Sequence, residues 1–350
     1  MNAVMIGDKK LEIPIIQGGM GVGVSRCHLA GAVAKEGAMG VISSAQIGYT
    51  QENFEKHPKE SNLDELSKQI KRAKEISQGH GLVAVNIMVA LQEYEDQVKT
   101  SCAAGVDAII SGAGLPSKLP EYVEGSNVKI APIVSSKKSA DVILHFWDHK
   151  YSRTADFIVI EGPKAGGHLG FKREELDHIE ELNYDQVVKD ILTVVKTYEE
   201  KFEKKIPVFL AGGIVTREDA EHAASLGVDG IQVASRFVAT NECDASDAYK
   251  NAYIQAKEED IVIIKSPVGM PGRAIRNPFV EKVSKDKEKI TFCYRCLHGC
   301  NPGTAPYCIT KALVNAVEGN LDEGLIFCGA RTGEINKIET VADVIRDLNV

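Results

Sequence analysis

The sequence lacks the features of a membrane or secreted protein. No apolar run approaches the ~18 residues that a membrane-spanning helix needs. The first residues, MNAVMIGDKKLEIP, contain neither the basic segment nor the long apolar segment of a secretory signal. Basic residues are also few, since 41 Lys and Arg stand against 49 Asp and Glu, a formal net charge of −8. A nucleic-acid surface needs a concentrated basic face. We therefore expect a cytoplasmic protein that binds neither nucleic acid nor membrane.

Eight short apolar runs alternate with longer amphipathic segments over the first 240 residues. Near-continuous hydrophobicity is typical of parallel strands buried on both faces. The predicted strands are Ile13–Ile16, Met39–Ile42, Leu82–Ile87, Asp107–Ile110, Lys129–Val134, Asp156–Ile160, Pro207–Leu210 and Gly230–Val233. The predicted helices between them are Ser25–Glu36, Asp64–Ser77, Tyr94–Ala104, Ser139–His149, Tyr184–Glu203 and Arg217–Ser225. Eight such units in ~250 residues predict a TIM (β/α)₈ barrel, with an open α/β sheet as the alternative.

The alternation stops at about Ile261. Residues 266–279, SPVGMPGRAIRNPF, are rich in Pro and Gly and predict a loop, and residues 280–290 predict a charged helix or a mobile segment. Two further helices are expected at Ile309–Glu318 and Val341–Leu348. We therefore divide the chain into a barrel of residues 1–260 and a Cys-containing C-terminal extension of residues 261–350 that covers one barrel face as a lid.

The loops after predicted strands seven and eight are suited to bind a phosphate. Gly212 and Gly213 follow strand seven in VFLAGGIVTRED, and Ala234 and Ser235 follow strand eight in IQVASRF. In a TIM barrel these two loops often bind phosphate, because their backbone N–H groups and the following helix N-termini favour negative charge. A Gly-Gly pair alone is common in such turns. Suitable residues on adjacent strands favour a phosphate site.

His168 follows strand six in EGPKAGGHLG, at the end of the barrel where catalytic residues lie. An isolated histidine is usually a surface or packed residue. This one stands in a loop, where an imidazole can act as a general acid or base near neutral pH. Gly166 and Gly167 permit close approach to a planar ligand. Strand one ends in GGMGVG, and Asn86 ends strand three with an amide that can donate and accept hydrogen bonds.

Several separated segments together resemble the nitronate monooxygenase (2-nitropropane dioxygenase) family, whose relatives include the FMN-dependent enoyl-ACP reductases. These segments are IPIIQGGMGVGVS, VNIM, SGAG, EGPKAGGHLG, AGGI and IQVASRF, within residues 10–280. The resemblance implies a TIM barrel with non-covalent FMN and His168 as the catalytic residue. It also implies contacts from Gly19, Met20 and Asn86 to the flavin ring, from Gly166 and Gly167 near the phosphate–ribityl side, and from Gly212, Gly213, Ala234 and Ser235 to the phosphate.

The sequence departs from the family pattern in two places. The family commonly has Gly-Thr or Gly-Ser before the RF dipeptide, whereas Ala234 precedes Ser235 here. Alanine retains its N–H, so phosphate binding is still expected. The second departure is the cysteine-rich tail, which leaves the exact reaction open.

Four of the eight cysteines crowd into CYRCLHGCNPGTAPYC: Cys293, Cys296, Cys300 and Cys308. Such crowding in a chain this long does not indicate a disulfide scaffold. Thiolates at this short spacing can converge on a soft metal or an iron–sulfur cluster. Zinc knuckles usually pair two Cys-x₂-Cys halves, which this segment does not. A [4Fe–4S] cluster, a zinc ion and unligated thiols remain open.

Three functions remain open for a protein that acts on a small molecule. The first is FMN-dependent oxidation of nitronates or nitroalkanes, with His168 as base or hydrogen-bond donor. The second is an NAD(P)H-dependent FMN reductase of activated C=C bonds, such as an enoyl-ACP reductase, in which His168 protonates carbon. A non-catalytic flavin-binding protein is the third, from a different class. The electron donor is open, and so is a homodimer.

Overall fold

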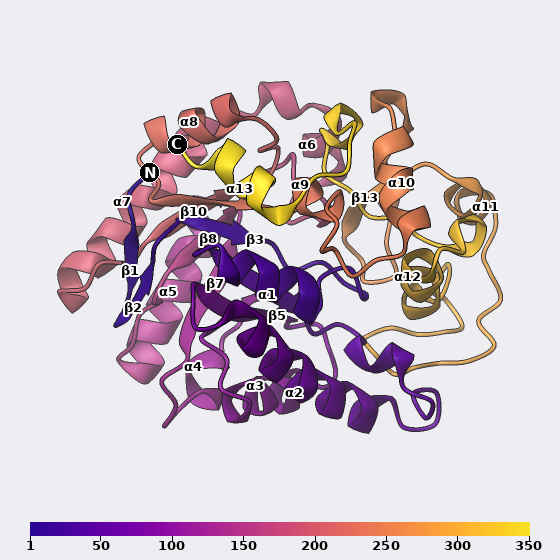
Figure 1. Cartoon of the computed structure of the whole chain (residues 1–350), viewed down its shortest axis with the longest axis horizontal. Coiled ribbons are helices and arrows are strands. Elements are labelled where there is room, and N and C mark those ends of the chain that lie inside the picture. Colours follow the sequence, from indigo (N-terminus) through magenta and orange to yellow (C-terminus); the bar gives the residue numbers. More distant parts are fainter.

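The computed structural model describes all 350 residues and contains a closed barrel of eight parallel strands (Figure 1). Around the barrel the order is β10, β11, β3, β4, β5, β6, β7 and β8. The strands are β3 (Ile15–Gln17), β4 (Met39–Ser43), β5 (Leu82–Met88), β6 (Ala108–Gly112), β7 (Lys129–Val134), β8 (Ile158–Glu161), β10 (Val208–Ala211) and β11 (Gly230–Val233). All eight predicted strands are present, and the predicted TIM barrel is confirmed.

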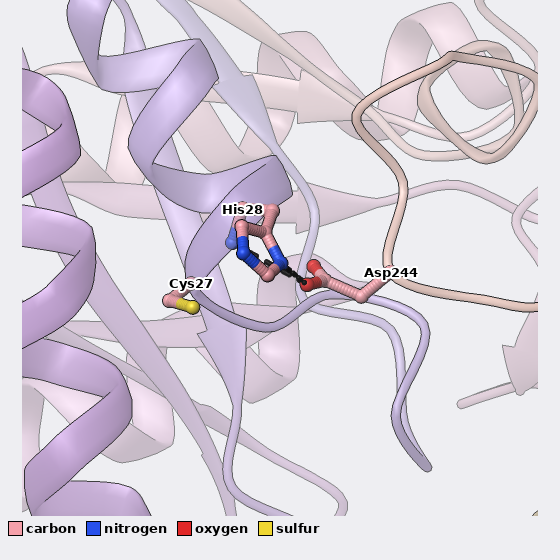
Figure 2. A group of neighbouring side chains, drawn as sticks. All are labelled: Cys27, His28 and Asp244. Carbon is pink, nitrogen blue, oxygen red and sulfur yellow. Dashed lines mark hydrogen bonds and ion pairs between the residues drawn. The ribbon is translucent and has the colours of Figure 1, made fainter.

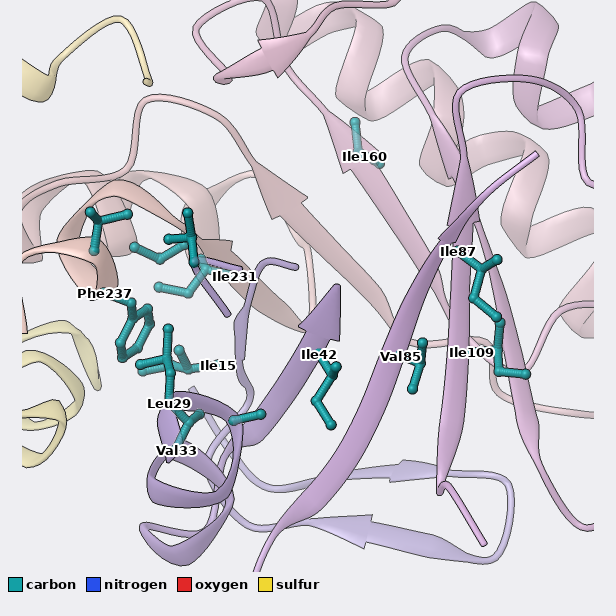
Figure 3. Packing of buried hydrophobic residues seen from close by; sticks show 14 of the residues in the cluster. Ile15, Leu29, Val33, Ile42, Val85, Ile87, Ile109, Ile160, Ile231 and Phe237 are labelled. Carbon is teal, nitrogen blue, oxygen red and sulfur yellow. The ribbon is translucent and has the colours of Figure 1, made fainter. Parts of the chain in front are cut away.

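Two hydrophobic layers follow from the period-2 alternation of side chains along each strand. Residues such as Ile16, Val41 and Phe209 belong to a cluster of 14 buried residues inside the barrel. The hairpin of β1 (Val4–Ile6) and β2 (Lys9–Leu11) adds to this inner cluster at the amino-terminal end of the strands. The alternate residues, such as Ile15, Ile42, Val85 and Ile231, point outward against the surrounding helices (Figure 3).

The outer helices agree closely with the periodicity of the sequence. They are α1 (Cys27–Lys35), α2 (Pro58–Ser77), α3 (Tyr94–Ala103), α4 (Leu119–Tyr122), α5 (Lys137–Tyr151), α6 (Arg173–Asp177), α7 (Tyr184–Phe202) and α8 (Arg217–Ser225). Helix α2 begins six residues before the predicted start at Asp64, because Pro58 occupies its first turn, where its missing N–H costs nothing. Short 3₁₀ helices are η1 (Ile47–Thr50), η2 (Ile179–Glu181), η3 (Glu258–Asp260), η4 (Leu321–Glu323) and η5 (Thr332–Glu334).

The prediction that residues 266–279 form a loop holds for residues 266–270 and is wrong for β13 and for the start of α11. After α9 (Ser235–Val238) and α10 (Asp247–Gln255), β12 (Ile261–Lys265) and β13 (Pro271–Ile275) pair antiparallel, and β13 also pairs with β9 (Gly167–His168). The Pro and Gly content concealed β13. Pro271 is its first residue, a position where proline is tolerated in a strand. Its partner β9 lies a hundred residues away in sequence.

The rest of the extension contains three helices joined by long irregular segments, and it packs onto the barrel. It contains α11 (Pro278–Lys285), α12 (Ile309–Glu318) and α13 (Val341–Leu348), the last two with the predicted bounds. Helix α13 contacts α1, α8 and α9, so it completes the outer ring beside the last strand (Figure 1). One cluster of 72 buried residues runs from Ile15 in the first barrel strand to Leu348 in α13. No helix combines the length and apolar character that crossing a membrane requires.

Candidate active site

A cavity of about 240 Å³ lies at the carboxyl ends of the barrel strands. Its floor is the last layer of inward-facing side chains. On β5, Leu82 and Ala84 face the barrel interior, so the alternation places Asn86 above them, facing the cavity. On β8, Val159 points inward, and Glu161 is the next residue on that face. The floor is completed by Ser43, Gly112, Ile133, Ala211 and Gln232.

The structure brings every predicted FMN contact and the predicted catalytic histidine to this one cavity. Its walls include Gly19, Met20, Asn86, Gly166, Gly167, His168, Gly212, Gly213, Ala234 and Ser235. The backbone at Gly19 packs closely on Asn86, since a Cβ at Gly19 would lie 2.5 Å from the Asn86 Cβ. A side chain at position 19 would therefore displace the Asn86 amide.

The glycine turn after β10 is flanked by two basic side chains that the sequence analysis missed. Gly213 has a φ of +82°, a left-handed conformation that favours glycine. The side chain of Lys164 packs against it, and Nη1 of Arg331 donates a hydrogen bond to the Gly213 carbonyl oxygen at 3.0 Å. Asp219 and Glu334 also pair with Arg331. Lys164 and Arg331 thus bring two cationic side chains to this end of the cavity, where Arg331 already has two carboxylate partners.

His168 lines the cavity from the short strand β9. Its Nε2 lies 2.7 Å from Oγ of Ser266, and its ring packs edge-on against Phe327, with 4.9 Å between the ring centroids. Nδ1 makes no hydrogen bond within the protein. Burial lowers the pKa of His168 from 6.5 to about 4. The imidazole is therefore neutral at pH 7.

A buried charged group supports the loop that carries Gly166. Arg273, only 3% exposed, donates a hydrogen bond from Nη1 to the carbonyl oxygen of Ala165. Desolvation lowers the pKa of its guanidinium, while Cys328 and Glu161 act against that shift. Burial also raises the pKa of Glu161 to about 7 and that of Cys328 to about 12. The extension thus positions one wall of the cavity through Arg273 in β13.

The remaining lining is largely apolar. Met20, Met88, Ile133, Leu313 and Phe327 line it, and Tyr253 fixes Phe327 by donating a hydrogen bond to its carbonyl oxygen. Lys164 lies within the quoted EGPKAGGHLG segment and could have been identified there. Phe327 and Arg331 carried no signal, because they come from the extension and reach the cavity only through the tertiary fold. The same holds for Arg273, which lies behind the cavity wall on the Ala165 carbonyl oxygen.

Comparison with known proteins agrees with this geometry. The family model described as nitronate monooxygenase matches residues 2–350. The chain belongs to the nitronate monooxygenase family. It is therefore a flavin-dependent oxidoreductase, as the sequence motifs predicted, and the non-catalytic alternative loses its support.

The proteins that this chain resembles in sequence or in structure carry names that refer to different activities. A probable nitronate monooxygenase of Staphylococcus saprophyticus is 26% identical over 311 residues, covering 83% of each chain. The (3aS,4S,5R,7aS)-5-hydroxy-7a-methyl-1-oxo-octahydro-1H-indene-4-carboxyl-CoA dehydrogenase of Mycobacterium tuberculosis is 25% identical, covering 78% of this chain and 66% of that protein. The solved structure of FabK from Thermotoga maritima is similar with a TM-score of 0.72 and 28% identity, covering 97% of this chain and 92% of that one.

The four tail cysteines do not line the cavity described above. They also do not form a compact site for a single metal ion. No three of the sulfur atoms of Cys293, Cys296, Cys300 and Cys308 lie within 4.8 Å of one another. Zn–S bonds of about 2.3 Å place tetrahedral thiolates only about 3.8 Å apart. The four thiols are therefore more widely spaced than in a tetrahedral zinc site, and the zinc alternative stays a prediction. All four are free thiols, and Cys293 is exposed.

Three side chains of types that can bind a metal lie close together elsewhere: Cys27, His28 and Asp244 (Figure 2). Their proximity is explained by the capping of a helix. The Asp244 carboxylate accepts hydrogen bonds from the backbone N–H of Arg26 at 2.8 Å and of Leu29 at 3.2 Å. Its Oδ1 lies 2.9 Å from Nδ1 of His28. These N–H groups belong to the first turn of α1, which has no cap from its own N-cap side chain. Asp244 therefore caps α1 from a distant segment, with no metal needed.

Proposed function

We propose that this chain binds FMN in the cavity and oxidises nitronates or nitroalkanes, with His168 acting on the substrate proton. One observation carries the proposal: a neutral histidine, with one ring nitrogen free of protein partners, lines the same cavity as the glycine-rich loops. The chain's membership of the nitronate monooxygenase family supports it.

The residues at the end of the cavity around Gly213 fit the phosphate of FMN. The backbone N–H groups of Gly212, Gly213, Ala234 and Ser235 would receive the phosphate oxygens, and Lys164 and Arg331 would balance their charge. Space for the cofactor is present next to this end. A Cβ at Gly167 would meet no atom within 4 Å, so the chain leaves that volume open.

The residues of the cavity at the ends of β3 and β5 fit the flavin ring. Gly19 and Met20 would contact the ring from one side, and the Asn86 amide can both donate to it and accept from it. When bound there, FMN would accept the electrons of the substrate. The protein supplies orientation, and the apolar lining limits access of water.

His168 is suited to remove a proton from a carbon atom next to a nitro group. A neutral imidazole has a free electron pair on one ring nitrogen, whereas an imidazolium has none. Nε2 faces Ser266, so Nδ1 is the nitrogen left for the substrate. When the ring takes up a proton, the Ser266 hydroxyl can accept the Nε2–H and hold the ring in place.

The proposal is tested with His168→Asn and the matched surface variant His80→Asn, since His80 is exposed between α2 and β5. Oxygen uptake is followed with 2-nitropropane and with its preformed nitronate. We expect His168→Asn to retain FMN and to lose about 10²- to 10⁴-fold in kcat with the nitroalkane, the usual loss for a general base. The nitronate needs no deprotonation and should lose less. An unchanged kcat in His168→Asn, or no turnover of either compound by the wild type, would contradict the proposal.

A second candidate is the reduction of enoyl thioesters by NADH or NADPH. The likeness to FabK at 28% identity favours it, and so does the apolar wall of Met88, Leu313 and Phe327, which suits an alkyl chain. Anaerobic mixing separates the two candidates. A reductase bleaches its flavin with NADH or NADPH and regains the yellow colour on addition of crotonyl-CoA. A nitronate oxidase bleaches with the nitronate and regains colour with oxygen.

A further inference from the structure

We propose that Cys293, Cys296, Cys300 and Cys308 bind a [4Fe–4S] cluster at the start of α12, beside the flavin cavity. This proposal is independent of the reaction proposed above, which uses none of these residues.

The four thiols are neighbours, although they are too far apart for one ion. Burial raises the pKa of Cys296 to about 11, and the nearby thiols of Cys300 and Cys308 add to this rise. Burial also raises the pKa of Cys308, and there the nearby thiols are those of Cys293 and Cys300. A cubane cluster attaches one thiolate to each of its four iron atoms, so it separates the four sulfur atoms more widely than a single ion does. The absence of any three sulfur atoms within 4.8 Å therefore fits the wider spacing of a cluster better than the compact spacing of a zinc site.

The backbone of the cysteine loop is shaped to present N–H groups to an anion. The residues before Cys296 and Cys300 both have left-handed conformations, Arg295 with a φ of 51° and Gly299 with a φ of 76°. Left-handed residues in turns form concave nests of successive N–H groups, which recur at iron–sulfur sites. Arginine rarely adopts this conformation, so the loop pays a strain energy for its shape.

Helix α12 adds further donors at the same place. Cys308 is its N-cap residue and has no side-chain capping hydrogen bond, so the first N–H groups of the helix remain available to negative charge. Near Cys308, the Tyr307 hydroxyl is buried and has no hydrogen-bond partner. The buried Thr310 hydroxyl has only the Cys296 thiol beside it, where it counteracts the rise in pKa that burial causes. Both residues are only 1% exposed. Buried hydroxyls rarely remain unpaired, and cluster-bound sulfur would give them acceptors.

The loop is fixed to the barrel next to the flavin site. The backbone N–H of Gln92 donates to the Cys296 carbonyl oxygen at 3.2 Å, and that of His298 donates to the Ala90 carbonyl oxygen at 2.9 Å. Ala90 and Gln92 follow β5, the strand that carries Asn86 into the cavity. From Cys308, α12 reaches the cavity-lining Leu313 in five residues, about 7.5 Å along the helix axis.

The test measures iron and acid-labile sulfide in the full-length protein, purified without oxygen and then incubated with ferrous iron and sulfide. We expect about four of each per chain, the composition of the cluster. Cys296→Ser and Cys308→Ser should lose most of the iron and keep their FMN. Cys102→Ser removes a partly buried thiol in α3, which is distant in sequence from the cysteine loop. This variant should keep both its iron and its FMN.

A second measurement needs no variant. While iron is bound, the four thiols should resist alkylation by iodoacetamide, and a chelator should expose them together. Less than one iron per chain after reconstitution, one zinc per chain, or equal alkylation with and without iron would overturn the proposal. Loss of iron without loss of FMN separates the cluster from the flavin site, so failure of one proposal leaves the other standing.

Discussion

At the scale of single residues, the charge state of His168 is set by burial and not by a charged partner. Desolvation is the only cause of its lowered pKa, and its hydrogen-bond partner is the uncharged Ser266 hydroxyl. Burial disfavours the imidazolium because a charge loses its hydration there. A general base that stays neutral well below pH 7 is therefore ready to accept a proton over a wide range of pH.

This charge state predicts the pH dependence of turnover. In the folded enzyme His168 takes up a proton only as the pH falls toward about 4, whereas in an unfolded chain it does so near its ordinary value of 6.5. Activity with a nitroalkane should therefore persist at pH 6 and fall with a midpoint near pH 4. Rapid pH-jump measurements of flavin reduction give this profile before any acid unfolding. A midpoint near 6.5 would show that the histidine is not desolvated.

The same shift links the titration of His168 to stability. Between pH 6.5 and about 4 the unfolded chain binds the proton and the folded chain does not. The contribution of His168 to the free energy of unfolding is therefore present above pH 6.5 and is lost progressively as the pH falls through this range.

At the scale of elements, a few long-range contacts attach the loops to the barrel. Strand β13 positions β9 and so His168, Arg273 holds the Ala165 carbonyl oxygen, and Asp244 caps α1. None of these partners is close in sequence. The loop after β8 therefore depends on the extension for its shape, and the start of α1 depends on a distant segment of the barrel.

The cap on α1 gives a prediction for stability. Asp244→Ala removes the acceptor for the N–H groups of Arg26 and Leu29, and loss of a cap typically costs about 0.5–2 kcal/mol. Urea unfolding should show this decrease in the free energy of unfolding. Glu221→Ala, an exposed position on α8 outside any ion pair, should change it little. If both variants were equally stable, Asp244 would not serve as a cap, and the group with Cys27 and His28 would need another explanation.

The sequence was most informative where structure depends on local patterns. The apolar runs located all eight strands, and the periodicity of Ile309–Glu318 and Val341–Leu348 located α12 and α13. Strand β13 was missed because its stability comes from pairing with β9 and β12, which local composition does not reveal. Glycine and histidine motifs at strand ends located most of the cavity. Arg331 in the cavity and Arg273 behind its wall were missed for the same reason as β13, since only the folded chain brings them to these places.

At the scale of the whole molecule, the cavity belongs to both parts of the chain. The barrel supplies its floor and its glycine loops, and the extension supplies Phe327, Cys328 and Arg331. One hydrophobic cluster joins the two parts. A cofactor bound in this cavity contacts both parts, so binding should stabilise them in one cooperative transition, by about 2.7 kcal/mol at a hundredfold excess over Kd.

The most direct test of the central claim is the FMN bound per chain by the wild type, Gly213→Asp and Gly79→Asp. The two glycines are matched, with φ of +82° and +81°, but only Gly213 lines the cavity, and a Cβ at Gly79 meets no atom within 4 Å. The aspartate at position 213 would place a carboxylate where the phosphate is expected. We predict about one FMN per chain in the wild type and in Gly79→Asp, and almost none in Gly213→Asp. Equal FMN content in all three proteins would contradict the assignment of the cavity.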